Sequence, residues 1–139
     1  IKMGDDHDND EKNWESILTP RQFNVTRRGG TEPAYSGPLY YEKRDGEYLC
    51  ICCGELLFTS DMKYESGCGW PSFHTEHPEA KITRIPDFKY GMIRTEVKCS
   101  SCDAHLGHVF NDGPREHGGE RYCINSASME FNAGGDDDN

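Results

Sequence analysis

The chain has 139 residues, of which 15 are basic and 25 are acidic, and its formal charge at pH 7 is −10. Only 34 % of the residues are hydrophobic, so the length suits one domain with a modest core. The acidic balance argues against nucleic-acid binding, and no apolar run approaches the roughly 20 residues of a membrane-spanning helix. Seven cysteines cannot all pair in internal disulfides, so at least one thiol has another role.

Both ends of the chain are predicted to be acidic disordered tails around a single domain at residues 17–132. Residues 1–16 have a net charge of −4, and residues 136–138, within the second tail at 133–139, add −3. Such runs repel themselves and solvate the protein, whereas the alternative of a weak calcium site lacks its loop pattern. Neither end shows a secretory signal. We expect a cytoplasmic protein, or an organellar one if a targeting segment upstream of Ile1 has been removed.

The first predicted element is a short helix that begins at Pro20. Thr19 suits the N-cap, Pro20 suits the first helical position, and Gln22 completes a capping box. Gly29 and Gly30 are expected to end this helix after about two turns.

Short strands are predicted for the rest of the domain, which shows no long helical periodicity. Residues 40–49 predict a hairpin that turns at Asp45-Gly46. Gly, Pro and Asp turn signals separate further candidate strands at residues 55–58, 81–85, 92–98, 108–110, 121–125 and 128–131. The pattern favours a mainly β, mostly antiparallel domain with a short N-terminal helix.

Two C-x-x-C pairs, Cys50/Cys53 and Cys99/Cys102, predict a metal site of four thiolates. Thiolates at this spacing on a tight turn point at one ion, and two such turns give the tetrahedral set that suits zinc. The 45 residues between Cys53 and Cys99 exceed the roughly 15–20 of a compact zinc ribbon. We therefore expect one structural zinc ion that clips two distant turns together.

Alternatives to this zinc site remain open. Either C-x-x-C pair could be a redox motif, although such motifs normally occur singly beside a βαβ pattern. His105 and His108 continue the spacing of Cys99 and Cys102 in steps of three, and they could be ligands on a helix face. Cys52, inside the first pair, is expected to be a spare thiol that points away from the ion.

Cys123 is a candidate reactive thiol. If residues 121–125 form a strand, then Arg121, Cys123 and Asn125 share one face. A guanidinium group two residues from a thiol favours the thiolate, and Asn125 adds a neutral hydrogen-bond donor. The alternative is an inert buried cysteine beside a surface arginine.

Cys68 is a second candidate, because Gly67 and Gly69 flank it. Glycines make a segment flexible and allow close backbone approach, which suits a thiol that must move to meet another. Trp70 and Phe73 are expected to form an apolar surface beside it. The alternative is a turn that carries two core aromatic residues.

His105 and His108 offer imidazoles that carry protons near neutral pH. Asp112 could orient one of them. A single histidine is more often structural, but two of them beside Gly107 make a functional pair an equal alternative.

Several of these motifs, in this order, resemble the methionine sulfoxide reductase B family. The matching segments are residues 67–73, 102–110 and 121–126, together with residues 31–33 and the paired C-x-x-C elements. The resemblance covers about Leu18 to Phe131, which leaves only the tails. It implies a fold of two antiparallel sheets, a β-sandwich or open barrel, and thiol chemistry on the R-epimer of methionine sulfoxide.

The resemblance also implies roles for individual residues. Cys123 matches the catalytic nucleophile, and Cys68 matches the resolving cysteine. Trp70 matches the aromatic residue that packs on the substrate methyl group, and we expect Phe73 and Phe110 to line the same site. The matching polar active-site residues are His105, His108, Asp112, Arg121 and Asn125. The matching zinc ligands, which some family members lack, are Cys50, Cys53, Cys99 and Cys102.

The chemistry expected from these roles is a thiol cycle. The Cys123 thiolate, stabilised by Arg121, attacks the sulfoxide sulfur while His108 or His105 supplies the proton for the oxygen. Methionine leaves, and Cys68 condenses with the resulting sulfenic acid of Cys123 to form a disulfide. The resemblance implies that thioredoxin then reduces this disulfide. The expected substrates are oxidised proteins or peptides, with free methionine sulfoxide as an alternative. We expect the protein to be a monomer and to repair oxidative damage.

Two other classes of function remain as rivals. One is a zinc-stabilised binding module without catalysis, which leaves the register of Arg121, Cys123 and Asn125 unexplained. The other is a general disulfide oxidoreductase that uses one of the C-x-x-C pairs.

Overall fold

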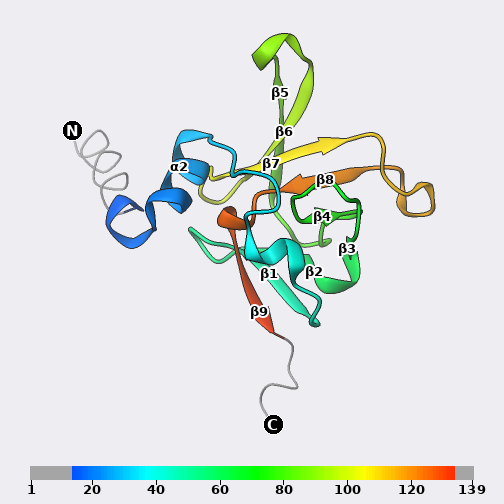
Figure 1. Ribbon diagram of the computed structural model, residues 1–139, viewed down its shortest axis with the longest axis horizontal. Coiled ribbons are helices and arrows are strands. Elements are labelled where there is room, and N and C mark those ends of the chain that lie inside the picture. Colours follow the sequence, from blue (N-terminus) through cyan, green and yellow to red (C-terminus); the bar gives the residue numbers. More distant parts are fainter. Residues whose placement is uncertain (1–13, 134–139) are drawn as a thin grey trace.

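The computed structural model describes residues 14–133, which fold into two antiparallel sheets and a few short helices (Figure 1). The smaller sheet has the order β2-β1-β9, built from β1 (Gly46–Cys50), β2 (Leu56–Thr59) and β9 (Met129–Ala133). The larger sheet has the order β3-β4-β8-β7-β6-β5. Its strands are β3 (Lys63–Tyr64), β4 (Ser72–Phe73), β8 (Arg121–Ile124), β7 (His105–Phe110), β6 (Arg94–Cys99) and β5 (Ile82–Asp87). The predicted mainly β class with two antiparallel sheets is confirmed.

Helix α2 (Pro20–Arg28) forms where the capping residues predict it. The Thr19 hydroxyl accepts a hydrogen bond from the Gln22 amide at 3.1 Å, and the Gln22 side chain accepts one from the Thr19 amide at 2.9 Å. Gly29 ends the helix with φ 73°, a left-handed conformation that glycine adopts at little cost. Residues 14–17 are also helical, so regular structure begins before the predicted domain boundary at residue 17. The rest of the two predicted tails lies outside the described residues.

The hairpin predicted at residues 40–49 is wrong in its first arm. Pro38 begins a 3-10 helix, η1 (Pro38–Tyr41), in which the side chain of Tyr40 is buried. Strand β1 pairs instead with β2 and β9. The turn between β1 and β2 is the segment that carries the first cysteine pair, and Gly54 within it has φ 82°. The tight turn of the hairpin is therefore the one that carries Cys50 and Cys53, not Asp45-Gly46.

Aromatic side chains from both sheets fill the core between them. The rings of Phe58 on β2 and Phe73 on β4 are stacked with centroids 4.1 Å apart, and Tyr48 on β1 meets Phe73 edge to face. Phe73 is fully buried and pairs across the sheet with Tyr122, another core residue. Phe73 is therefore a core residue and not the substrate contact that the sequence predicts. Its neighbour Ser72 lies on the opposite face, because side chains alternate along a strand.

Five 3-10 turns connect elements within the described residues, and two of them matter below: η3 (Lys89–Gly91) and η5 (Ser126–Ser128). Turn η3 lies at the tip of the β5–β6 hairpin, which extends well beyond the rest of the larger sheet (Figure 1). Among the described helices, none is both long and apolar enough to cross a membrane.

Candidate active site and metal centre

The four predicted zinc ligands come together at one end of the sheets. Cys50 and Cys53 flank the turn after β1, and Cys99 and Cys102 flank the turn after β6. Their Sγ atoms all lie within 4.8 Å of one another, with 3.6 Å between Cys50 and Cys102 and 3.5 Å between Cys53 and Cys99. A Zn–S distance of about 2.3 Å requires S···S separations of about 3.8 Å in a tetrahedron. The four thiols therefore could hold a metal ion, and their number and spacing fit zinc.

The alternative of mixed cysteine and histidine ligation is not supported. His105 and His108 belong to strand β7 rather than to a helix, and their ring nitrogens bind carboxylates elsewhere. Cys52 is partly buried and lies outside the group of four thiols, but its side chain contacts Cys50 and Cys102 rather than pointing away from the cluster. Arg27 of helix α2 donates a hydrogen bond to the carbonyl of Cys102 at 2.8 Å, which ties the helix to the turn that carries Cys99 and Cys102.

The two candidate reactive thiols face each other, with 3.7 Å between the Sγ atoms of Cys68 and Cys123. Cys123 lies in the middle of β8, opposite Ser72 of the short strand β4. Cys68 lies in the loop before β4, where Gly67 has φ 78° and Gly69 has φ 95°. These two left-handed glycines curve the loop back over β8 and thereby bring the two thiols together.

The Cys68 loop is held by the segment that follows helix α2. The amide of Tyr35 donates to the carbonyl of Gly69 at 2.7 Å, and the Tyr35 hydroxyl donates to the carbonyl of Gly67 at 2.9 Å. A Cβ on Gly69 would lie 2.8 Å from the Cβ of Ala34, which is too close. The glycines flanking Cys68 thus permit a tight backbone path, and backbone hydrogen bonds fix that path.

The Sγ atoms of Cys68 and Cys123 lie within hydrogen-bonding distance, and their surroundings favour the anion on Cys68. A hydrogen bond from Cys123, supported by the hydroxyls of Ser66 and Ser72, lowers the pKa of Cys68 to about 4. The same contact, together with burial, raises the pKa of Cys123, whereas the nearby Arg121 guanidinium acts in the opposite direction. These opposite pKa shifts favour a thiolate at Cys68, whereas the sequence predicts the thiolate at Cys123.

Alkylation by iodoacetamide should report the thiolate at Cys68. Because a depressed pKa keeps the thiolate populated above it, Cys68 should react at close to its maximal rate at pH 6 and slow only as the pH falls towards 4. Replacing Cys123 by alanine removes the donor and should move the midpoint of the Cys68 rate profile upward by about one pH unit or more. Peptide mapping after pulsed labelling measures the profile. An identical midpoint in Cys123→Ala would contradict the hydrogen bond between the two thiols.

A β-bulge places both histidines on the same face as Cys123. Gly107 pairs with Val97, and the next pair is His105 with Lys98, so Leu106 has no opposite residue on β6. The extra residue reverses the alternation. His105 thus shares the face of His108, which pairs with Cys123 on β8, and the imidazole centroids are 5.7 Å apart.

Each histidine is paired with a carboxylate that the sequence does not single out. Nδ1 of His105 donates to Glu96 at 2.6 Å, and Nε2 of His108 donates to Asp87 at 2.9 Å. Burial lowers the pKa of His105 although Glu96 opposes that shift. The hydrogen bond from His108 lowers the pKa of Asp87 to about 2. Both imidazoles are therefore held in fixed orientations by anionic partners.

Asp112 does not orient a histidine, as the sequence suggests it could. Its two carboxylate oxygens accept hydrogen bonds from Arg121 at 2.8 and 3.1 Å. The Arg121 guanidinium also lies 4.6 Å from the ring centroid of Phe110. Asp112 and Phe110 thus hold the arginine that lies beside Cys123.

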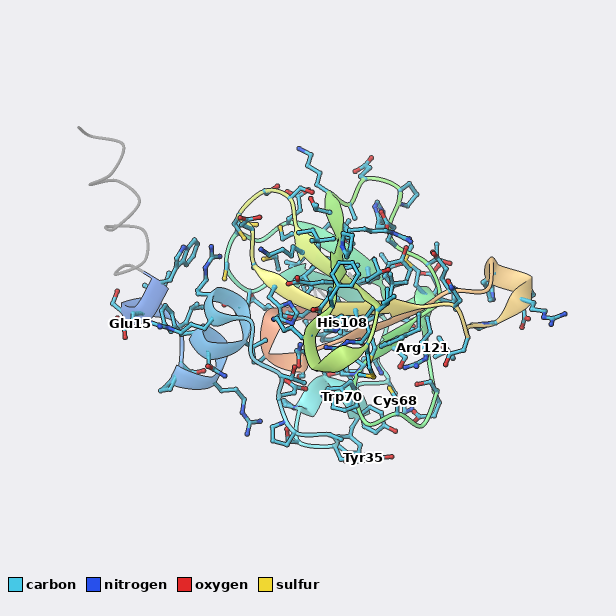
Figure 2. All side chains as sticks on the ribbon, turned by 90° about the horizontal axis from the view of Figure 1, so that it is seen from above. Glu15, Tyr35, Cys68, Trp70, His108 and Arg121 are labelled. Carbon is cyan, nitrogen blue, oxygen red and sulfur yellow. The ribbon has the colours of Figure 1, made fainter. Side chains whose placement is uncertain are left out.

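A small pocket of about 100 Å³ opens over Cys123. Its lining includes the predicted residues Trp70, His108, Phe110, Cys123 and Asn125, together with Thr31, Arg94 and Gly107. In Figure 2, Cys68, Trp70, His108 and Arg121 gather in one region of the molecule, although they come from different elements. The pocket therefore presents an aromatic wall, an imidazole and a thiol to the same small volume.

Glu32 supports this pocket from behind. Its backbone carbonyl accepts a hydrogen bond from the Trp70 indole at 2.9 Å, and its amide donates to Asn125 at 3.0 Å. Its buried carboxylate accepts the amides of Ser126 and Ala127 on turn η5. Asn125 donates one of its two amide hydrogens to the carbonyl of Leu106 at 3.0 Å, which fixes its side chain at the pocket.

Replacing Glu32 by glutamine should destabilise the protein. Glutamine retains one acceptor oxygen but faces the second amide with its own NH₂ group, which leaves a buried donor without a partner. The expected loss in free energy of unfolding is about 1–3 kcal/mol. Urea denaturation measures it, with the exposed Glu130→Gln as control. Equal stability in the two variants would contradict the anchoring role of Glu32.

Three charged residues near the two histidines are not predicted from the sequence: Asp87, Arg94 and Glu96. All three lie on β5 and β6, and Arg94 pairs with Asp87 both in register and through a 3.3 Å ion pair. Their sequence neighbourhood carries no motif. Only the strand register, which links Glu96 to His108, shows that they belong to the site.

Comparison with known proteins agrees with this geometry. The SelR domain model matches residues 18–133. The chain is 53 % identical over 123 residues to the peptide methionine sulfoxide reductase MsrB of Hahella chejuensis, covering 88 % of each chain. It is 56 % identical over 122 residues to the protein of the same name from a Synechococcus species, covering 87 % of this chain and 88 % of the relative. The Acinetobacter baylyi protein is 50 % identical over 121 residues, which are 87 % of this chain and 86 % of the relative. The chain belongs to the methionine sulfoxide reductase B family, whose signature is the SelR domain.

Proposed function

We propose that this protein is an oxidoreductase that reduces methionine sulfoxide, specifically the R-epimer, in oxidised polypeptides. The observation that carries the proposal is the pair of thiols 3.7 Å apart at a small aromatic pocket with two histidine–carboxylate pairs. A sulfoxide needs these groups, because its methyl is apolar, its oxygen must be protonated and its sulfur must receive two electrons. Family membership supports the same reaction.

The pocket residues suggest how the substrate is held. Trp70 and Phe110 can pack against the methyl and thioether groups, since sulfur and aromatic rings attract each other weakly. The sulfoxide oxygen then faces the imidazoles. Each imidazole directs one N–H at its carboxylate, so only the doubly protonated ring can donate to the oxygen; Nε2 of His105, which is buried without a hydrogen-bond partner among the described residues, and His108 are the two candidates.

The first chemical step transfers oxygen to Cys123. Cys123 passes its proton to Cys68, its sulfur attacks the sulfoxide sulfur, and His108 or His105 protonates the oxygen. The S–O bond of the substrate breaks, and the oxygen leaves as the hydroxyl of a Cys123 sulfenic acid. The substrate sulfur gains the two electrons that Cys123 loses, and methionine is released.

The second step forms a disulfide between the two cysteines. Cys68 attacks the sulfenic sulfur and the hydroxyl leaves as water, for which the Sγ atoms must close from 3.7 Å to about 2.05 Å. Cys68 also lines an open pocket of about 440 Å³ with Tyr64, Pro114 and Arg121. A dithiol protein of the thioredoxin type can reach Cys68 there and restore both thiols by exchange.

We assign the four-cysteine cluster a structural zinc ion, held by Cys50, Cys53, Cys99 and Cys102. The ion supplies a cross-link between distant turns, and the cluster is separate from the reacting thiols. We further propose that the protein works as a monomer in a reducing compartment, with the cytoplasm as the simplest choice.

An assay on both sulfoxide epimers tests the proposed function. Dithiothreitol is supplied first as reductant, and thioredoxin with its reductase second. We expect reduction of the R-epimer alone, with either reductant. Activity on neither epimer would overturn the proposal in favour of a binding module. Disulfide exchange that persists in Cys123→Ser and requires a C-x-x-C pair would instead favour a general disulfide oxidoreductase.

A further inference from the structure

The tip of the β5–β6 hairpin exposes an unusual amount of apolar surface. Within residues 88–93, Phe88 is 67 % exposed, Met92 is 50 % exposed and Ile93 is 82 % exposed. The other large apolar side chains exposed in the described part of the chain are Ile17, Tyr35 and Tyr41. Single exposed apolar residues are common on protein surfaces, whereas a cluster on a protruding segment marks an interaction site. We call residues 88–93 the hairpin tip.

The hairpin tip is continuous with the wall of the pocket. The last pair of the β5–β6 ladder is Asp87 with Arg94. Asp87 binds His108, and Arg94 lines the pocket over Cys123. Phe88 follows Asp87 directly and Ile93 precedes Arg94 directly, so each exposed side chain starts about 3.8 Å along the backbone from a residue of the site. The tip extends outward from that point (Figure 1).

The size of the pocket determines what reaches the hairpin tip. A volume of about 100 Å³ accommodates one side chain and no main chain beyond it. A polypeptide with its oxidised methionine in the pocket must therefore run over the rim. Extended chain advances about 3.3 Å per residue, so residues within a few positions of the methionine can reach the hairpin tip.

We propose that the hairpin tip binds apolar residues that flank methionine sulfoxide in a polypeptide substrate. This inference rests on the proposed function and names its substrate class: oxidised segments that are unfolded or that expose residues normally found in a core. A second copy of this chain is a poorer occupant. Phe88, Met92 and Ile93 together offer about 500 Å² at most, below the roughly 800 Å² that each partner of a stable dimer buries.

The test compares three R-sulfoxide substrates with dithiothreitol as reductant. The first is the N-acetylated, C-amidated amino acid, the second is a peptide with apolar flanking residues, and the third is the same peptide with serine and glycine flanks. The variant is the double replacement Phe88→Ser/Ile93→Ser. The matched control is Ile17→Ser, because Ile17 is as exposed as Phe88 but lies before helix α2. Circular dichroism and thermal melting confirm that each variant is folded.

We expect the double variant to lose about tenfold in kcat/KM on the apolar peptide, through KM, which corresponds to about 1.4 kcal/mol. Its kcat/KM on the blocked amino acid and on the serine–glycine peptide should match that of the wild type. Equal loss on all three substrates, or no loss on any, would overturn the inference. So would a loss seen only when thioredoxin replaces dithiothreitol, or wild-type dimerisation in sedimentation that the variant abolishes. If the wild type fails on the blocked amino acid, the proposed function fails instead.

Discussion

Replacing Cys123 by serine should abolish reduction of methionine sulfoxide, with a fall in kcat of about 10³-fold or more. A serine hydroxyl is a far weaker nucleophile than a thiol and has no counterpart to the sulfenic acid that carries the oxygen away. Cys123 is the thiol that lines the pocket, where it pairs across the sheet with His108. Methionine release, measured by chromatography on the R-epimer with dithiothreitol, gives the rate.

The matched variant Cys68→Ser should behave differently. It retains the nucleophile, so one methionine per enzyme should form in the first turnover. Steady turnover with thioredoxin should then stop, because the sulfenic acid on Cys123 has no neighbouring thiol. Normal recycling in Cys68→Ser would contradict the resolving role of Cys68 and would direct attention to Cys52. Activity in Cys123→Ser would remove the mechanism altogether.

Replacing Cys99 by serine should remove the metal and unfold much of the protein. Structural zinc sites contribute about 10–16 kcal/mol to the folding of small domains. This contribution is as large as the whole net stability of most proteins, about 5–15 kcal/mol. We therefore expect less than a tenth of the wild-type zinc content by elemental analysis, together with a loss of the cooperative thermal transition. Cys99 is fully buried in the cluster, and its loss leaves three of the four thiols that a tetrahedral ion needs.

Cys52→Ser is the control for the metal site, since Cys52 lies one residue from Cys53 but outside the four-thiol group. It should bind one zinc per chain and melt like the wild type. Wild-type zinc content in Cys99→Ser would contradict the assigned ligand set. Loss of zinc in Cys52→Ser would show instead that the two thiols exchange roles in the first turn.

The features predicted correctly from the sequence are those that depend on neighbouring residues. The capping box at Thr19 and Gln22 is complete within four residues. Each C-x-x-C pair occupies one turn, so its two thiols point the same way whatever the rest of the fold does. The same holds for Arg121 and Cys123, whose shared face follows from strand alternation. Local patterns were sufficient for the chemistry-bearing thiols.

The features that were missed depend on how strands pair. Phe73 appeared to belong with Trp70, but its pairing with Tyr122 turns it into the core. Asp87 and Glu96 can be identified as site residues only when the pairing of β5, β6 and β7 is known. The prediction of a hairpin at residues 40–49 is wrong because Asp45-Gly46 is a good turn signal only when taken in isolation. In the folded chain, β1 pairs with β2 and β9 instead. Register is a property of the whole sheet, and a single sequence does not reveal it.

The bulge in β7 makes the site sensitive to strand length. With one extra residue, the chain shifts phase between Gly107 and His105, so that His105 joins the face of His108. A substitution at Leu106 can alter packing but cannot undo that shift. Deletion of a single residue there would restore the regular phase and turn His105 away from its partner histidine. Substitutions within β7 therefore leave His105 on the face of His108. A one-residue insertion or deletion within β7 would not, so the site can evolve by substitution but not by such changes in strand length.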